Sequence, residues 1–536
     1  MLSYRKLAMR VLGRPLHTGG IDSPRPASQR AAAFILTAAM LTTLAAPAFA
    51  GTWYIENGDI TVKAGKTGND VTQNNVTTEN DPDTIITNEN KDTASSHTVT
   101  IETNDKNDKV EVTLKDVNID TSSRNKAAVS VTGEGDTNIK LDGDNALKSD
   151  TYRSGIYGSG SGSLTISGGE NDSLTAQGGS GANGISSSGS LTISGGTVTA
   201  NGDDGGRGIS SSGSVTISGG STVTANGGSG TISGGDGIWS GGGVTISGGS
   251  TVTANGGNGG SLVGGDGIRS GGGLTVSDGT VTAKGGNGDS KDGYGGDGIR
   301  SGGVVTISGN TVNAAGGYGG KVGGYGICSF DRVAISGGTV EAAGGNGSTG
   351  GGSGIYSSVI DLSGSLELTA KAGSPTGKAL LQNGHELNLD DIKEKLGPGA
   401  KVTATDANGE TKQVSIPRPV EPEESSSSSD GGSATPSAPA SPLPGLTVTD
   451  KDGQRISYTS TQSGNTLTVC VGRFTASLRI SLAALRQLRA EGIETIAFQT
   501  VLCSTTLSVD ELLAMGGEDA EAVLTHRLTD SSLTVG

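Results

Sequence analysis

The stretch GIWSGGGVTISGGSTVTA, residues 237–254, recurs with variations along the middle of the chain. Each copy holds a Gly-Ile pair, a Val-Thr-Ile-Ser run, a Thr-Val-Thr-Ala run and a glycine-rich spacer. The isoleucines of these pairs follow one another at intervals of 24 to 31 residues: Ile156, Ile185, Ile209, Ile238, Ile268, Ile299, Ile327 and Ile355. Self-similarity at such a period predicts a stacked repeat architecture.

Apolar and small polar residues alternate within each copy. Val244, Ile246, Val252 and Ala254 share one parity, and threonine or serine holds the other. This period of two is typical of strands with one buried face, whereas the recurring glycine and β-branched residues disfavour a helix. Three such runs per copy, separated by glycine corners, predict an all-β fold, a right-handed parallel β-helix with three strands per coil.

The spacer is the part of the repeat that varies most in length. It is short at 201–208 and long at 285–298. Insertions in repeat proteins gather on one face, which is often the face that binds a partner. Any binding site is therefore expected beside the spacers.

The composition changes three times along the chain. We expect a signal peptide at 1–50, the β-helix at 51–415, a Pro/Ser-rich linker at 416–445 and a small α+β module at 446–536. Within the β-helix, we expect irregular entry coils at 51–150, regular Gly-rich repeats at 151–370 and a closing segment at 371–415. Capping residues in the module predict two helices, at 481–491 and 509–515.

The first fifty residues have the pattern of an export signal. A basic region precedes an apolar stretch at 31–46, and Ala48-Phe49-Ala50 stands before the expected cut at Gly51. A membrane anchor is the alternative interpretation. We expect a secreted or cell-surface protein whose formal net charge, −16 for the whole chain, grows more negative once six basic residues and one acidic residue are removed. Nucleic acid and anionic membranes are poor partners for such a protein, and cations are good ones.

The chain has three cysteines. Cys470 and Cys503 both lie in the small module, where they either pair or remain free. Cys328 follows a Gly-Ile pair, at the position that Arg269 and Arg300 hold in the preceding coils. It is therefore expected to be an unpaired thiol on the surface.

Stacking turns each repeat position into a ladder of side chains. At the position before Gly-Ile, three successive coils carry Asp236, Asp266 and Asp297, expected about 4.8 Å apart. Like charges at that distance repel, and a Ca²⁺ ion among them would relieve the repulsion with oxygen ligands. This predicts a calcium site at the three aspartates. The alternative is ordinary Asp-Gly turn chemistry, with each carboxylate in solvent.

A second ladder runs just after Gly-Ile and faces outward, because its isoleucine neighbours face inward. It brings Trp239 beside Arg269 and Arg300. An aromatic ring and two bidentate donors suit a sugar ring and its carboxylate, so these three residues are the predicted ligand-binding set. The alternative is a Trp-Arg surface contact without a ligand.

Paired threonines form a third array, at Thr197 and Thr199 and at the equivalent positions of the next three coils. This Thr-x-Thr surface resembles the ice-binding face of insect antifreeze solenoids. Threonine is also a preferred solvent-facing strand residue, and that interpretation is favoured.

The sequence offers little for catalysis. Outside the signal, the histidines are His97, His385 and His526, and none lies near a Gly-x-Ser-x-Gly motif. We therefore assign no catalytic residue. The alternative is a polysaccharide lyase or hydrolase that uses carboxylates and arginines of the two ladders.

The runs 110–120 and 136–147, followed by the Leu-Thr-Ile-Ser-Gly-Gly coils, carry a resemblance to a known family. The chain resembles secreted right-handed β-helix proteins of anaerobic Gram-positive bacteria, in particular a carbohydrate-binding family with a pectate-lyase-like fold. The resemblance covers about Gly51 to Ser415. It implies association with calcium and acidic plant polysaccharide.

Together these patterns predict a non-catalytic, exported β-helix that binds polysaccharide, such as polyuronate, with Ca²⁺ between the acidic protein and the acidic glycan. A second hypothesis is a surface adhesin or structural spacer that displays the C-terminal module to an unknown partner.

Overall fold

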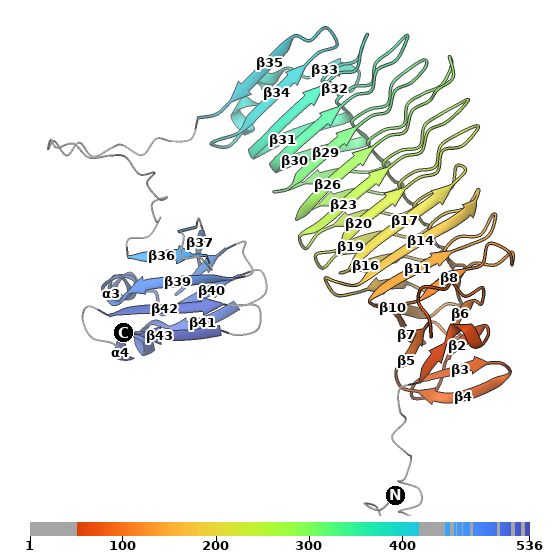
Figure 1. Ribbon diagram of the computed structural model, residues 1–536. Helices are drawn as coiled ribbons and strands as arrows, with labels where there is room; N and C mark the ends of the chain where they lie inside the picture. Colours follow the sequence, from red (N-terminus) through yellow and green to blue (C-terminus); the bar gives the residue numbers. More distant parts are fainter. Residues whose placement is uncertain are drawn as a thin grey trace, which may run out of the picture. The chain divides into compact units, whose positions relative to one another are not determined.

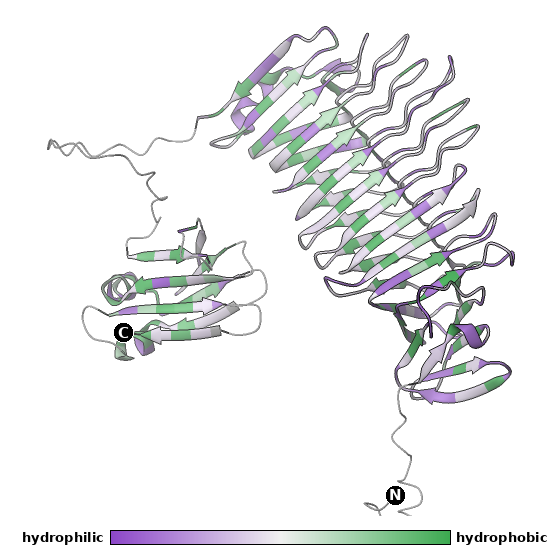
Figure 2. Ribbon diagram, in the orientation of Figure 1, coloured by the Kyte–Doolittle hydropathy of each residue, from purple (hydrophilic) through white to green (hydrophobic). Residues whose placement is uncertain are grey.

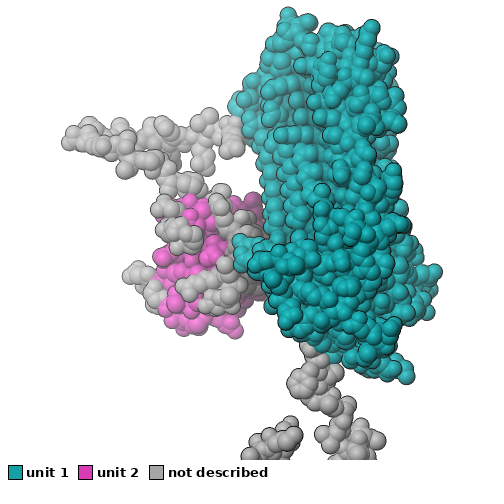
Figure 3. Space-filling model, turned by 45° about the vertical axis from the view of Figure 1, so that its right-hand side comes forward, with its two compact units in different colours: residues 1–421 teal, residues 422–536 magenta. Residues whose placement is uncertain are grey.

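The computed structural model describes residues 51–417, 445–450, 455–456, 458–463, 465–471, 475–500, 504–515, 520–526 and 531–535. The expected signal peptide and most of the expected linker lie outside these residues. The chain divides into two compact units, residues 1–421 and 422–536, which are described separately (Figure 3).

The first unit is a parallel β-solenoid of about 14 turns, which confirms the predicted β-helix architecture (Figure 1). Most coils have three short strands, and each pairs in parallel with its counterpart in the next coil. The first column, which in the regular coils begins at the Gly-Ile isoleucine, contains β6 (Val99–Glu102), β9 (Val129–Thr132), β12 (Ile156–Gly158), β15 (Ile185–Ser187), β18 (Ile209–Ser211), β21 (Ile238–Ser240), β24 (Ile268–Ser270) and β27 (Ile299–Ser301).

The other two columns carry the remaining runs of the repeat. The second contains β7 (Lys109–Lys115), β10 (Asp136–Asp142), β13 (Leu164–Ser167), β16 (Leu191–Ser194), β19 (Val215–Ser218), β22 (Val244–Ile246), β25 (Leu274–Val276) and β28 (Val305–Ile307). The third contains β8 (Asn118–Asp120), β11 (Asp144–Lys148), β14 (Ser173–Ser180), β17 (Thr197–Asp203), β20 (Thr222–Asn226), β23 (Ser250–Asn255), β26 (Gly279–Lys284) and β29 (Thr311–Ala315). In β30 (Ile327–Ala343) and β31 (Ile355–Lys371), all three columns run on as one long strand.

Short elements close both ends of the solenoid. The N-terminal end has β1 (Thr52–Tyr54), a 3₁₀ turn η1 (Ile55–Asn57), β2 (Ile60–Ala64), β3 (Asn69–Gln73), β4 (Val76–Asp81) and β5 (Thr84–Thr87). The C-terminal end has β32 (Leu380–Gln382), β33 (His385–Glu386), the 3₁₀ turn η2 (Leu389–Lys395), β34 (Lys401–Thr405) and β35 (Thr411–Ser415). The antiparallel pairs β2–β3, β3–β4 and β34–β35 cover the terminal coils, whose edges would otherwise offer unpaired backbone groups.

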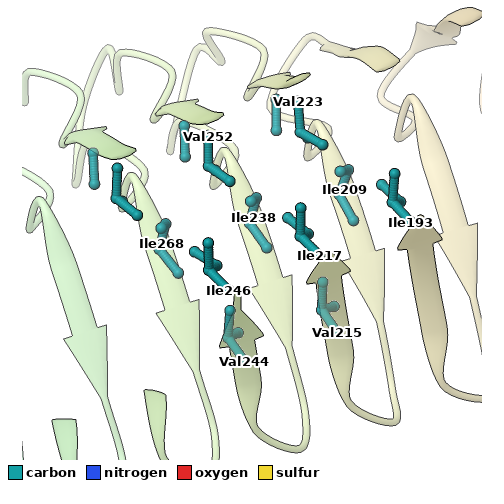
Figure 4. Packing of buried hydrophobic residues seen from close by; sticks show 14 of the residues in the cluster. Ile193, Ile209, Val215, Ile217, Val223, Ile238, Val244, Ile246, Val252 and Ile268 are labelled. Carbon is teal, nitrogen blue, oxygen red and sulfur yellow. The ribbon is translucent and has the colours of Figure 1, made fainter. Parts of the chain in front are cut away.

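The core is a narrow column of small aliphatic side chains. Ile238, Val244, Ile246, Val252 and Ala254, which come from the three strands of one coil, are almost fully buried. Ile238, Val244, Ile246 and Val252 point toward one another, and equivalent residues repeat from coil to coil (Figure 4). Apolar bands therefore lie in register across successive strands (Figure 2). Because one coil buries few side chains, the column gains its stability by stacking.

Two kinds of glycine shape each coil. Gly248 and Gly249 form the corner between β22 and β23 with φ of +63° and +71°, a conformation that side chains disfavour. The second kind fills the spacers that join the third column to the first, which we name the glycine loops: residues 227–237, 256–267, 285–298, 316–326 and 344–354. These loops stack along one edge of the solenoid (Figure 1).

The glycine loops are joined by a continuous chain of backbone hydrogen bonds. The Gly257 N–H donates to Gly235 O, Gly265 N–H to Gly257 O, and Gly286 N–H to Gly265 O, each at 2.8 Å. A Cβ atom on Gly265 would lie 1.9 Å from Gly235 O, a distance that no side chain tolerates. Glycine is required here by space rather than by a positive φ.

The second unit is a small α+β fold with its own core. One antiparallel sheet contains β36 (Leu446–Thr449), β39 (Ala476–Ser481), β42 (Glu521–His526) and β43 (Ser531–Val535). The other sheet is mixed, because β38 and β40 pair in parallel, and it contains β37 (Thr459–Ser463), β38 (Thr466–Cys470), β40 (Thr495–Gln499) and β41 (Ser504–Ser508). Both expected helices are present, as α3 (Leu482–Ala490) and α4 (Val509–Met515).

Two details of this unit bear on the sequence predictions. Ser481 caps α3, because its Oγ accepts a hydrogen bond from Ala484 N at 3.2 Å. Cys470 is a free thiol whose Sγ donates to Gln499 Oε1 at 3.2 Å, and Cys503 lies outside the described residues.

No helix within the described ranges combines the length and apolarity needed to cross a bilayer.

Candidate functional site

Three aspartates stack at the foot of the glycine loops. Asp236 Oδ1 accepts a hydrogen bond from Asp266 N (2.9 Å), Asp266 Oδ1 from Asp297 N (2.7 Å), and Asp297 Oδ1 from Tyr325 N (2.7 Å). Each carboxyl therefore ties its coil to the next. All three residues are at most 7% exposed, so the interpretation that placed them in solvent is wrong.

The second oxygen of each carboxyl faces an arginine. Asp236 Oδ2 lies 3.2 Å from Arg207 Nε, and Asp297 Oδ2 lies 3.4 Å from Arg300 Nη1. Asp266 has the longest contact, 4.0 Å between Oδ2 and Arg269 Nη1. The carboxyls are buried while the arginines remain partly exposed, so the guanidinium groups form the accessible layer of the cluster.

Burial changes the titration of two of these carboxyls. Loss of water raises the pKa of Asp266 to about 8, and repulsion by Asp297 and Asp236 adds to the rise. Burial also raises the pKa of Asp297 to about 6, although hydrogen bonding from Tyr325 N and the charges of Arg300 and Arg269 oppose it. Asp266 is therefore largely protonated at neutral pH.

The outward ladder has the register that the sequence predicts. Trp239 pairs with Arg269, and Arg269 with Arg300, across adjacent strands β21, β24 and β27. The arginine that contacts the indole is Arg207, however, whose Cζ lies 4.3 Å from the ring centroid. Trp239 thus holds the guanidinium that also pairs with Asp236.

A cavity of about 520 Å³ opens at this cluster, and we name it the arginine cavity. Four of the six predicted site residues are among its lining residues, and Asn183 and Arg207 join them: Asn183, Arg207, Asp236, Asp266, Arg269 and Arg300. The remaining wall contains Val263, backbone of the first two glycine loops, and Gly181, Gly205 and Gly206 from the two preceding spacers. With Asp266 protonated, three guanidinium groups outnumber the two other carboxyls of the cluster, so the cavity favours an anion at neutral pH.

The geometry around the aspartates bears on the calcium hypothesis. Four other aspartates near this edge are exposed: Asp203 at the end of β17, Asp204 after it, and Asp289 and Asp292 in the glycine loop 285–298. Across the part of the chain that the structure describes, no group of three or more His, Cys, Asp or Glu side chains is arranged to hold a metal ion. A cation at the three aspartates would have to compete with the backbone N–H groups and arginines that they already contact.

Cys328 is buried, so the prediction of a surface thiol is wrong. It is 1% exposed, and burial raises the pKa of its thiol to about 12, with the charge of Asp297 adding to the rise. The cause is its place in the ladder, between the larger Arg300 and Tyr356. The ring of Tyr356 in turn stacks on Tyr325 at 5.1 Å between centroids.

Sequence reasoning missed Arg207 and Asn183 as members of the site. Both hold the same repeat position as the aspartates, one and two coils earlier, and Asn183 Oδ1 accepts from Arg207 N at 2.8 Å. The signal was therefore present in the ladder itself. It lies in the hydrogen-bonding side chain that these members share with the aspartates, and not in a negative charge.

Comparison of the chain with protein-family models, with curated proteins and with solved structures gave no significant match.

Proposed function

We propose that the solenoid is an exported, non-catalytic binding protein for an acidic polysaccharide of the polyuronate class. The observation that carries the proposal is the convergence of Arg207, Arg269 and Arg300 in the arginine cavity. Guanidinium groups bind carboxylates through two parallel hydrogen bonds, and a uronate presents one carboxylate on every sugar. The cavity volume of about 520 Å³ is within the range of small-ligand sites.

The buried aspartates have a supporting role in this proposal. They hold the arginines in place through Oδ2 and hold the coils in register through Oδ1. Because Asp266 is largely protonated at neutral pH, Arg269 keeps donors for a ligand carboxylate. The sugar would lie over the arginines, with Trp239 behind Arg207 as part of the support.

The proposal predicts that arginine replacement abolishes glycan retention. The double variant Arg269→Gln/Arg300→Gln is expected to bind immobilised polygalacturonate at least about a hundredfold more weakly, since a hydrogen bond to a charged group contributes about 1.5–3 kcal/mol. A pull-down with increasing soluble polymer measures this. Arg332→Gln is the matched control, because Arg332 is exposed and lies outside the arginine cavity. Equal retention of the double variant and the wild type would contradict the proposal.

Calcium forms a second arm of the same experiment. If Ca²⁺ sits at Asp236, Asp266 and Asp297 and bridges to the glycan, a chelator abolishes retention and added Ca²⁺ restores it. If the arginines bind the carboxylates directly, retention survives the chelator and falls with salt. The arginine geometry favours the second outcome.

The other hypotheses predict different products. A lyase or hydrolase would release new unsaturated or reducing ends from polyuronate during long incubation. A spacer would lose attachment to its partner when residues 446–536 are deleted, whereas a lectin would keep its glycan binding.

A further inference from the structure

Two further cavities lie along the solenoid on the N-terminal side of the arginine cavity. They measure about 320 and 220 Å³, and they share Arg153 and Tyr157 as a common wall. The smaller one shares Gly181 and Asn183 with the arginine cavity. The three cavities therefore follow one another along the outward face of the first strand column.

The chemistry of the two cavities is cationic and aromatic. Arg153 is exposed, its Nε donates to Asn125 Oδ1 at 3.2 Å, and it forms no ion pair with any residue that the structure describes. This differs from the arginine cavity, where every guanidinium faces a carboxyl. A ligand carboxylate at Arg153 would displace no internal partner.

Two tyrosines flank this arginine. Tyr157 is 42% exposed and belongs to the outward ladder, five strand pairings before Arg300. Tyr152 is 78% exposed, yet its backbone has a φ of +60°, which is unfavourable for a bulky residue. Such strain at an exposed aromatic residue points to a role beyond packing.

Local contacts hold Tyr152 in this strained position. Its N–H donates to Ser180 O at 2.8 Å, and its ring lies directly against Gly181. A Cβ atom on Gly181 would lie 2.9 Å from Tyr152 Cε1, so a larger residue there would displace the ring. The ring is thereby presented at the edge of the 220 Å³ cavity that it lines.

We propose that Arg153, Tyr152 and Tyr157 form a second sugar-binding subsite, in which Arg153 takes a uronate carboxylate and the tyrosine rings pack against the sugar. The subsite rests on the proposed function and extends it, because a single glycan chain then spans both sites. Five coil steps of about 4.8 Å separate Tyr157 from Arg300, a span of about 24 Å. Ser186, Ser210, Trp239 and Arg269 of the ladder lie between these ends. The two small serines leave room beside Tyr157, and the glycan would then pass over Trp239 to reach Arg269.

The subsite predicts that binding depends on glycan length. A fragment long enough to reach both sites gains avidity, which for linked sites amounts to about a hundredfold or more. Arg153→Gln is therefore expected to weaken the binding of long polygalacturonate fragments about a hundredfold. For trigalacturonate, titration calorimetry of the full chain should fall from two molecules bound per protein to one. Arg332→Gln again serves as the control.

The outcomes separate this inference from the function on which it rests. If the wild type binds neither fragment, the proposed function fails and the subsite fails with it. If the wild type binds both fragments and Arg153→Gln changes neither the affinity for the long fragment nor the stoichiometry of the short one, only the subsite is wrong. Tyr157→Ala gives an independent check, since it removes the aromatic wall and leaves the charge unchanged.

Discussion

Alanine at position 265 is expected to destabilise the solenoid by about 3 kcal/mol, the upper end of the range for overpacking. The new Cβ would lie 1.9 Å from Gly235 O and 2.4 Å from Gly235 C, and both are backbone atoms that cannot rotate away. The hydrogen bond from Gly257 N to Gly235 O, which joins these two loops, would have to lengthen as they separate. Since the arginine cavity is walled by these loops, the cavity would distort as well.

Urea unfolding measured by tryptophan fluorescence tests this, because both tryptophans, Trp53 and Trp239, lie in the solenoid unit. The matched control is Gly337→Ala, whose Cβ would lie 3.4 Å from its nearest neighbour and whose φ is not in the left-handed region. In repeat proteins the damage stays local, so hydrogen exchange should increase most in the coils on either side of Gly265. Equal urea midpoints for Gly265→Ala and Gly337→Ala would contradict the claim that close contact between the glycine loops stabilises the solenoid.

The solenoid is also expected to lose stability as the pH rises from about 4 to about 8. Burial raises the pKa of Asp266 to about 8 and that of Asp297 to about 6, whereas an aspartate in the unfolded chain titrates near 3.9. Between these values the folded protein holds a proton that the unfolded chain has released. Stability therefore falls with pH, by up to about 1.4 kcal/mol per pH unit for each such carboxyl.

Asp266→Asn is expected to weaken the loss of stability at the higher pH values and to stabilise the protein at pH 8. The amide keeps an oxygen for Asp297 N, just as Asn183 Oδ1 accepts from Arg207 N at 2.8 Å in the same ladder. The experiment compares urea midpoints at several pH values between 5 and 8, with Asp278→Asn as the control at an exposed carboxyl. A wild-type stability that is flat or rises across this range would contradict the assignment.

The stability of the solenoid is also expected to fall at low pH. Although partial burial works against it, hydrogen bonds from Arg124, Lys126 and Thr98 N hold the pKa of Asp59 below its ordinary value. A depressed folded pKa gives stability that is lost as the pH falls through and below about 4. The solenoid should therefore be most stable near the lower end of the tested range.

The fold could be predicted from the sequence because a strict alternation of Val, Ile and Thr leaves one buried face and one period. The repeat also fixed which residues meet, and it correctly placed Trp239, Arg269 and Arg300 in adjacent strands. These are consequences of backbone register alone. They need no knowledge of how the side chains pack.

Burial of the site could not be predicted in the same way. The sequence predicts a surface thiol at Cys328, because this residue holds the position of Arg269 and Arg300 in the outward ladder. For the three aspartates, the alternative to a calcium site places each carboxylate in solvent. In the structure, paired glycines let the loops approach at backbone distance and cover this edge. The signal lies in pairs such as 227–228 and 234–235, which recur in every loop at positions where a positive φ is not needed.

A crystal structure of the protein with an oligogalacturonate tests the central claim most directly. The account predicts a sugar carboxylate within hydrogen-bond distance of Arg269 or Arg300 in the arginine cavity, with the chain continuing toward Arg153. A glycan bound on another face of the solenoid, or an arginine cavity that stays empty while the protein binds the glycan in solution, would contradict it.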